Sequence, residues 1–594
     1  MDLIPARRLA IAAVLGLAAT VPARPAPAES PDARFDELAR QYIDRFPALS
    51  PVSATHLGDH RYDGELDAVS AEAREQNARF CRETLARLEA VDADALSRDR
   101  QVDWTLLRHH LRSRQWHLET LQEWAWNPLV YTRLAGDAVY GLMARDFAPL
   151  PARLARVADR LEAFPRLFEQ VRSTLDPARV PREHAETAVE QNRGIRVLLD
   201  GMVKPRLDGL PPDARGRLEK ALATAGDAVA RHQAWLETEL VPKAAGNSRL
   251  GAALYDAKLA FALPGSLTRP QIRERAAQAL REIRGEMYRI AIDVYRKRYP
   301  RTDVPHEPTE AYRQAIIRAC LEVAGRETPA PDTLVDCARR SLERVTDFVR
   351  QKDLVTLPAD PVEIIVMPEF QRGVSLAYCD APGPLDTGQK TFYAVSPVPA
   401  DWTPEQVQSH LREYNLRSLH DLSMHEGVPG HYLQLAAANR HPSRLRAVLA
   451  SAPFIEGWAV YGEAMMIDQG FLDGDPLMRL VNRKWQLRSV ANALLDVGVH
   501  TEGLTQEAAM RLMMEETFQE EREAAAKWRR AQLTSAQLPV YFVGFLEHTA
   551  LRREVEQAWG SRFRLKTYHD RLLSFGSPPV PLARALLLDL EIPR

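Results

Sequence analysis

Apolar residues recur at intervals of three and four along most of the chain, a spacing that places side chains on one face of an α-helix. One such run consists of Leu154, Val157, Leu161, Phe164, Phe168 and Val171. Pro165 lies inside this run, and we expect it to kink or divide the helix because proline cannot donate a backbone hydrogen bond. The same periodicity continues over residues 31–260, so the sequence predicts a helical N-terminal region.

The helical pattern is interrupted near residue 360. Residues 362–367 and 390–396 are short runs rich in β-branched and aromatic side chains, with Pro and Gly turn residues between them, which predicts two strands of a small sheet. The sequence Thr403-Pro-Glu-Gln406 then has the features of a helix N-terminus with a capping box. The predicted fold class is therefore mainly α, with a small β-sheet. We expect residues 29–265 and 266–594 to form one continuous domain.

The first 28 residues have the features of a secretory signal peptide. Arg7 and Arg8 precede an apolar run over residues 9–21, and the small-residue sequence Ala26-Pro-Ala28 follows it. The run is shorter than the roughly 20 residues that a membrane-spanning helix needs. We therefore expect residues 1–28 to be cleaved and the mature protein to be secreted or periplasmic, with no integral membrane segment.

Charge composition argues against nucleic-acid binding. Lys and Arg total 78 and Asp and Glu total 80, without a long run of either sign, so the chain lacks the basic patch typical of nucleic-acid partners. We therefore expect partners to be small or neutral.

The four cysteines are too few for a disulfide scaffold. Cys320 and Cys337 lie equally far from a turn that joins two predicted helices, 311–325 and 332–350. An exported protein would permit a disulfide between them, and two unpaired thiols are the alternative.

His425 and His431, with Glu426 between them, are the first candidates for a metal site. Six residues turn a continuous helix by roughly 600°, so the two rings would point about 120° apart and could not bind one ion. However, two glycines and Pro429 separate the histidines, and Pro429 cannot continue a helix. We expect the helix to open there and bring both imidazoles to one side. The alternative is an ordinary Pro-Gly helix terminus with two incidental histidines.

Glu456 and Glu463 are candidates for the rest of this site. They lie seven residues apart on a predicted apolar helix, so both carboxylates share one face. Catalytic zinc takes three protein ligands and a water, and we choose Glu456 as the third ligand. Glu463 would orient an imidazole, although a solvated side chain is the alternative. Glu426 would take the proton of the water.

Other residues are weaker candidates for catalytic roles. Asp496 and His500 lie four residues apart on a predicted helix and could support the site or stabilise an intermediate. Tyr541, and after it His569, could donate a hydrogen bond to the oxyanion of a tetrahedral intermediate. An ordinary surface pair is the alternative for Asp496 and His500, and buried structural roles are the alternative for Tyr541 and His569.

Several segments resemble the bacterial family catalogued as domain of unknown function 885, whose members look like gluzincin-type metallopeptidases with an HEGxPGH motif. The matching segments are 367–373, 411–415, 425–434, 456–459, 495–500, 518–521, 537–544 and 568–570, with Gly576. The resemblance implies a two-lobed metallopeptidase architecture, zinc bound by His425, His431 and Glu456, and Glu426 as catalytic base. It also implies that a strand near the metal, for which we choose residues 392–396, holds the extended substrate.

The predicted function is an exported zinc-dependent hydrolase that cleaves peptide or amide bonds through a metal-activated water. Two alternatives are a metal-dependent hydrolase of a non-peptide amide or ester and a non-enzymatic periplasmic binding or scaffold protein. Peptide end specificity stays open, because many arginines could meet a substrate terminus. One departure from the family is that Ser535 and Ala536 replace the Pro-Gly found in many members.

Overall fold

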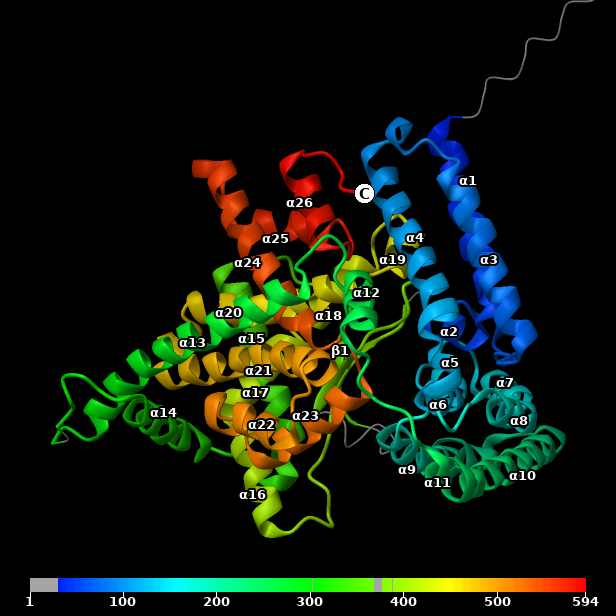
Figure 1. The fold of residues 1–594 in the computed structure, drawn as a ribbon, viewed down its shortest axis with the longest axis horizontal. Coiled ribbons are helices and arrows are strands. Elements are labelled where there is room, and N and C mark those ends of the chain that lie inside the picture. Colours follow the sequence, from blue (N-terminus) through cyan, green and yellow to red (C-terminus); the bar gives the residue numbers. More distant parts are fainter. Residues whose placement is uncertain (1–29, 302, 368–375, 387) are drawn as a thin grey trace, which may run out of the picture.

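A computed structural model describes residues 30–301, 303–367, 376–386 and 388–594 (Figure 1). In this part of the chain helices predominate and the sheet has three strands, so the mainly-α prediction is confirmed. The predicted signal peptide lies outside the described residues. None of the described helices combines the length and the apolar character needed to cross a bilayer.

Residues 30–251, called here the N-terminal lobe, contain two groups of helices (Figure 1). The predicted helix over residues 154–171 is divided into α7 (Leu150–Glu162) and α8 (Phe164–Thr174). Pro165 lies in the first turn of α8, so the prediction that it divides the helix is confirmed. The helices are α1 (Pro31–Leu49), α2 (Pro51–His56), α3 (Ala71–Glu89), α4 (Arg98–Trp116), α5 (Glu123–Trp126), α6 (Leu129–Met143), α7 (Leu150–Glu162), α8 (Phe164–Thr174), α9 (Arg182–Leu198), α10 (Pro212–Trp235) and α11 (Val241–Lys243).

Residues 252–594, the C-terminal lobe, are built around α20 (Ala452–Asp468) and α21 (Pro476–Thr501), which are buried on nearly every side. Such all-round burial is typical of a central helix. The helices are α12 (Ala252–Ala262), α13 (Arg269–Arg298), α14 (Glu310–Gly325), α15 (Leu334–Lys352), α16 (Pro404–Glu413), α17 (Leu416–Glu426), α18 (His431–Ala438), α19 (Arg444–Val448), α20 (Ala452–Asp468), α21 (Pro476–Thr501), α22 (Gln506–Arg511), α23 (Glu521–Leu533), α24 (Pro539–Trp559), α25 (Leu565–Leu573) and α26 (Val580–Leu588).

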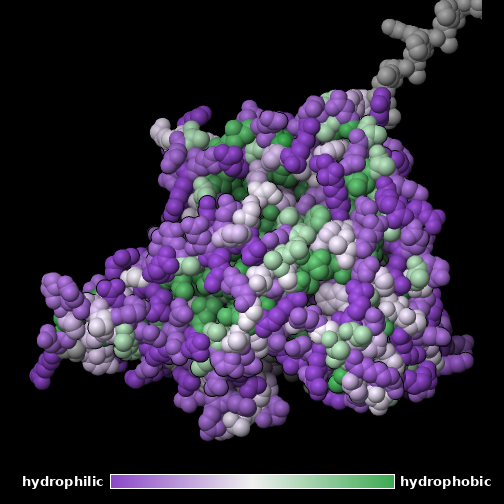
Figure 2. Space-filling view, viewed as in Figure 1, coloured by the Kyte–Doolittle hydropathy of each residue, from purple (hydrophilic) through white to green (hydrophobic). Residues whose placement is uncertain are grey.

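The two lobes share a hydrophobic core and polar contacts. Apolar side chains of α1 and α4 pack with those of α19 and α26. Between the lobes, the backbone N–H of Leu385 donates to Leu57 O at 2.8 Å, and His60 Nε2 lies 3.1 Å from Asp386 Oδ1. Figure 2 shows the molecular surface from the same side as Figure 1. Apolar side chains lie toward the middle of this face, whereas its rim is mostly hydrophilic.

The small sheet consists of β1 (Val362–Val366), β2 (Ala377–Asp380) and β3 (Thr391–Val395), in the order β1-β3-β2. The two predicted strands correspond to β1 and β3, and β2 is an additional strand. β3 pairs in parallel with β1 and antiparallel with β2, so both of its edges are occupied. The prediction that residues 392–396 hold a substrate by main-chain hydrogen bonds is therefore wrong, because a central strand has no free edge.

The four cysteines carry free thiols. The two predicted helices around Cys320 and Cys337 are confirmed as α14 and α15, but α14 packs against α13 and α21 whereas α15 packs against α17. The Cys320 thiol donates to Ala291 O of α13 at 3.2 Å. These two thiols consequently do not form the disulfide that the sequence permitted.

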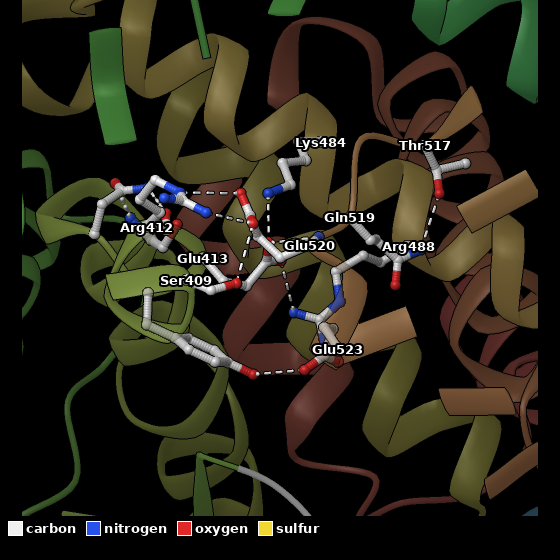
Figure 3. A network of polar contacts seen from close by, with 12 residues as sticks. Ser409, Arg412, Glu413, Lys484, Arg488, Thr517, Gln519, Glu520 and Glu523 are labelled. Carbon is white, nitrogen blue, oxygen red and sulfur yellow. Dashed lines mark hydrogen bonds and ion pairs between the residues drawn. The ribbon is translucent and has the colours of Figure 1, made fainter. Parts of the chain in front are cut away.

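A buried network of charges joins α16, α21 and α23 (Figure 3). Lys484 Nζ donates to Glu413 Oε2 at 2.6 Å, and Arg488 pairs with Glu523. Removing either partner of such a pair would leave an uncompensated buried charge, which costs several kcal/mol. The network therefore fixes the position of α23 relative to α21.

The close crossing of α20 and α24 depends on glycine. A Cβ atom on Gly457 would overlap the backbone of Gly544, whereas a Cβ on Gly285 of α13 would meet open space. We expect Gly457→Ala to destabilise the protein by about 1–3 kcal/mol. As the matched control, Gly285→Ala should be neutral or stabilise by up to about 1 kcal/mol, because alanine is the better helix former. Urea denaturation followed by circular dichroism measures the free energy of unfolding of both variants. An unchanged midpoint for Gly457→Ala would contradict the requirement for glycine at this helix crossing.

Candidate metal centre

The chain between the two candidate histidines forms a break between two helices. α17 ends at Glu426 and α18 begins at His431, so the helix does open at Pro429 as predicted, although as two helices rather than one expanded turn. The Gly430 N–H donates to Met424 O at 2.9 Å, and a Cβ on Gly430 would overlap His425 O. Only glycine allows this close approach, which turns both imidazoles toward α20.

Three side chains converge on one point. His425 Nε2 and His431 Nε2 lie 3.6 and 3.3 Å from Glu456 Oε2, and the two imidazole rings are nearly perpendicular, at 82°. Tetrahedral zinc lies about 2.0–2.2 Å from nitrogen and oxygen ligands, which places neighbouring ligand atoms roughly 3.3–3.6 Å apart. One ligand atom from each residue lies within 4.8 Å of the others, so the arrangement fits a metal ion.

The Glu456 carboxylate has the properties of a cation ligand. Its Oε2 atom is buried and receives no well-aligned hydrogen bond, which is unusual for a buried polar atom. Burial raises the pKa of Glu456, but the charges of His431 and His425 outweigh burial and hold this pKa below its usual range. The carboxylate is therefore ionised and available to a cation.

Glu463 orients His425 from behind. Its Oε1 lies 2.5 Å from His425 Nδ1, and its side chain is buried, so it is not the solvated carboxylate considered as the alternative. A hydrogen bond at Nδ1 leaves Nε2 free to face Glu456. Asp421, which the sequence analysis missed, is buried near Glu463 and accepts a 2.9 Å hydrogen bond from Asn482 Nδ2. The sequence did contain a signal for Asp421, because a residue four positions before His425 lies on the same face of a helix.

Glu426 lies beside the three converging side chains without being one of them. It is buried, and its Oε2 accepts a 2.9 Å hydrogen bond from the backbone N–H of Cys379 in β2. Burial raises the pKa of Glu426 more than the charges of His425 and His431 lower it. A carboxylate with a raised pKa next to a metal site is suited to accept and return a proton near neutral pH.

Tyr541 of α24 also lies close to the centre. Burial and the charge of Glu456 raise the pKa of Tyr541, whereas Arg530 lowers it in part, so the phenol keeps its proton. Its hydroxyl accepts a hydrogen bond from Arg530 Nη2 at 3.3 Å. A protonated phenol at this place can donate to a substrate oxygen. Arg530 was not among the residues predicted from the sequence, because nothing local distinguishes it from other arginines.

His569 occupies a structural position. Its Nε2 is 2.8 Å from the Tyr461 hydroxyl, its Nδ1 is 2.8 Å from Leu354 O, and its ring contacts Trp458 edge-on. Burial lowers the pKa of His569 to about 4, so the ring is neutral. With both nitrogens engaged inside the core, and no described contact with the three converging side chains, His569 does not fit the predicted oxyanion role.

Asp496 and His500 do not bond to each other among the described residues. Asp496 Oδ2 accepts hydrogen bonds from the Tyr255 hydroxyl at 2.7 Å and from the Ala536 N–H at 2.8 Å. His500 Nε2 lies 2.7 Å from Thr534 O, and its ring stacks on Tyr255. The predicted pair therefore holds the loop before Tyr541 instead of acting at the centre.

The comparisons with known proteins agree with this fold. A family model described as a bacterial protein of unknown function, DUF885, matches residues 51–587. The structure of a candidate lipoprotein of unknown function from Shewanella oneidensis has 32% identity and a TM-score of 0.79, over 93% of this chain and 99% of that one. A candidate lipoprotein from Colwellia psychrerythraea has 17% identity and a TM-score of 0.77, over 94% and 100%. No curated protein matches the sequence.

Glu463→Gln should weaken zinc binding by about 10–100-fold, because loss of the carboxylate removes the charged partner that orients His425. Asp468→Asn is the matched control, since Asp468 is an exposed acid at the end of the same helix. Competition with a chromogenic chelator measures both affinities. Equal zinc affinity in wild type and Glu463→Gln would contradict the orienting role.

Proposed function

The chain belongs to the bacterial family of unknown function DUF885, and from the geometry of its candidate centre we propose that it is a zinc-dependent hydrolase of peptide or amide bonds. The observation that carries the proposal is the convergence of His425, His431 and Glu456 beside a buried carboxylate, Glu426, that is not one of the ligands. Catalytic zinc sites have three protein ligands and an open position, whereas structural sites have four.

The residues of the chain divide the chemistry among them. A bound zinc ion would polarise the scissile carbonyl and lower the pKa of a water molecule. Glu426, held by the Cys379 N–H, takes the proton of that water as the water oxygen bonds to the carbonyl carbon. It then passes the proton to the nitrogen of the leaving amine as the C–N bond breaks. The Tyr541 hydroxyl donates to the carbonyl oxygen as negative charge develops there.

β2 is the strand that would hold an extended substrate. It pairs with β3 on one side, and the N–H of Cys379 points away from β3 toward Glu426. A peptide added alongside β2 would lie next to the proposed base. The Cys379 N–H stays with Glu426, so hydrogen bonds to the peptide would come from other outward-facing main-chain groups of β2.

The same groups would also hydrolyse a non-peptide amide or an ester. The geometry therefore supports the type of reaction, hydrolysis at an acyl carbon, more directly than it supports a particular substrate. A binding or scaffold role is less well supported, because a structural metal site has no use for a buried, unliganded carboxylate such as Glu426. We also propose that the protein is exported, secreted or periplasmic, from the signal-like N-terminal sequence and from the description of the two similar structures as candidate lipoproteins.

Purified protein should contain about one zinc ion per chain. The double variant His425→Ala, His431→Ala should lose it, because two of three ligands are gone. His306→Ala, which removes an exposed imidazole elsewhere, is the control and should keep the metal. Elemental analysis after zinc supply gives the answer, and a wild type without metal would exclude the proposed centre.

Glu426→Gln should keep zinc while lowering kcat on a quenched-peptide library by about 10²–10⁴-fold, because the amide cannot accept the proton. Glu405→Gln, at an exposed acid in the first turn of α16, is the control and should behave as wild type. Full activity of Glu426→Gln would rule out its role as base.

A further inference from the structure

Most cations packed around α23 have a carboxylate partner. Figure 3 shows three of these pairs, Arg412 with Glu520, Lys484 with Glu413 and Arg488 with Glu523. The next positively charged residue along the helix, Lys527, lies 3.8 Å from Glu523 Oε1. The pairing is expected, because a buried charge without a partner is costly.

Arg530 differs, although it lies one turn further along α23 and is half-buried. Its Nη2 donates to two neutral groups, Gln537 Oε1 at 3.0 Å and the Tyr541 hydroxyl at 3.3 Å. Among the described residues no carboxylate oxygen lies within ion-pair distance, and Nε and Nη1 have no acceptor. These two nitrogens have no hydrogen-bond partner in the part of the chain that the structure describes and neither is fully buried, so both face accessible space. Three N–H donors of the guanidinium thus remain available.

The guanidinium is held in place before any ligand arrives. Gln537 follows Ala536, whose N–H is bound to Asp496 Oδ2 of α21, so the loop that carries Gln537 is fixed to the core. Tyr541 is fixed on α24. A fixed arginine with a free edge matches the two oxygens of a carboxylate and binds them with charge-assisted hydrogen bonds.

We propose that Arg530 binds the C-terminal carboxylate of the peptide substrate, and that the protein removes one or two residues from a free C-terminus. The inference rests on the proposed hydrolase function. The Tyr541 hydroxyl would lie about 3 Å from the scissile carbonyl oxygen. Arg530 Nη2 donates a hydrogen bond to this same hydroxyl. Since a residue spans roughly 3.3–3.6 Å, only one or two residues fit between the scissile bond and the guanidinium.

The first experiment uses wild-type enzyme with zinc and one tetrapeptide in four forms, with the amino end free or acetylated and the carboxyl end free or amidated. Mass spectrometry identifies the products. We expect cleavage of both free-carboxyl forms one or two residues from the C-terminus, and at least about tenfold lower kcat/KM for the amides. Equal cleavage of acids and amides, or a requirement for a free amino end, would overturn the inference and leave the hydrolase function intact. If the zinc-loaded enzyme cleaves none of the four peptides and no member of the peptide library, the hydrolase proposal itself is overturned.

The second experiment separates substrate binding from an effect through Tyr541. Arg530→Gln should lower the ratio of kcat/KM for the acid to that for the amide by about 10–100-fold, and Arg530→Lys should restore part of it. Arg529→Gln, at the exposed neighbour on α23, is the matched control and should leave the ratio unchanged. An equal loss on acid and amide would show that Arg530 only positions Tyr541, which would overturn the proposal.

Discussion

The candidate centre depends on the helix break between α17 and α18. Two imidazoles six residues apart diverge on a continuous helix, and they meet here only because the backbone folds back over Gly427–Gly430. The break is stabilised from the core, since the Trp458 indole of α20 donates to Pro429 O at 2.8 Å. The helix that supplies Glu456 therefore also holds the loop that aligns the two histidines.

Burial gives the same region its electrostatic character. Asp421, Glu463, Glu456 and Glu426 place four carboxyl groups in a largely buried region, which would be strongly unfavourable without cations. The imidazoles offset part of this charge, and a metal ion bound between them would offset more. Burial and the charge of Glu463 raise the pKa of Asp421, which favours its protonated form and removes a further negative charge. Arg530 is the complementary case, a positive charge whose described hydrogen bonds go to two neutral groups.

Local rules in the sequence were enough to predict several features. Proline geometry located the division at Pro165, the capping box at Thr403 marked the start of α16, and a seven-residue spacing put Glu456 and Glu463 on one face. Features that depend on distant pairing were missed or wrong. The four residues of β2 carry no strong strand pattern, and only the pairing of β3 with β1 and β2 reveals which strand is central. The roles of His500 and His569 likewise follow from partners far along the chain.

The loop after β2 joins the lobes close to the base. β2 donates its Cys379 N–H to Glu426, and a few residues later the chain is bound to the N-terminal lobe through Leu385 and Asp386. Burial opposes protonation of His60, but Asp386 and Asp63 outweigh it and raise its pKa to about 9, so this contact is an ion pair at neutral pH. A fragment beginning near residue 266 would carry every candidate ligand, yet the strand that holds Glu426 would have lost its anchorage. The N-terminal helices are thus part of the scaffold of the candidate centre rather than an accessory module that evolution or protein engineering could exchange.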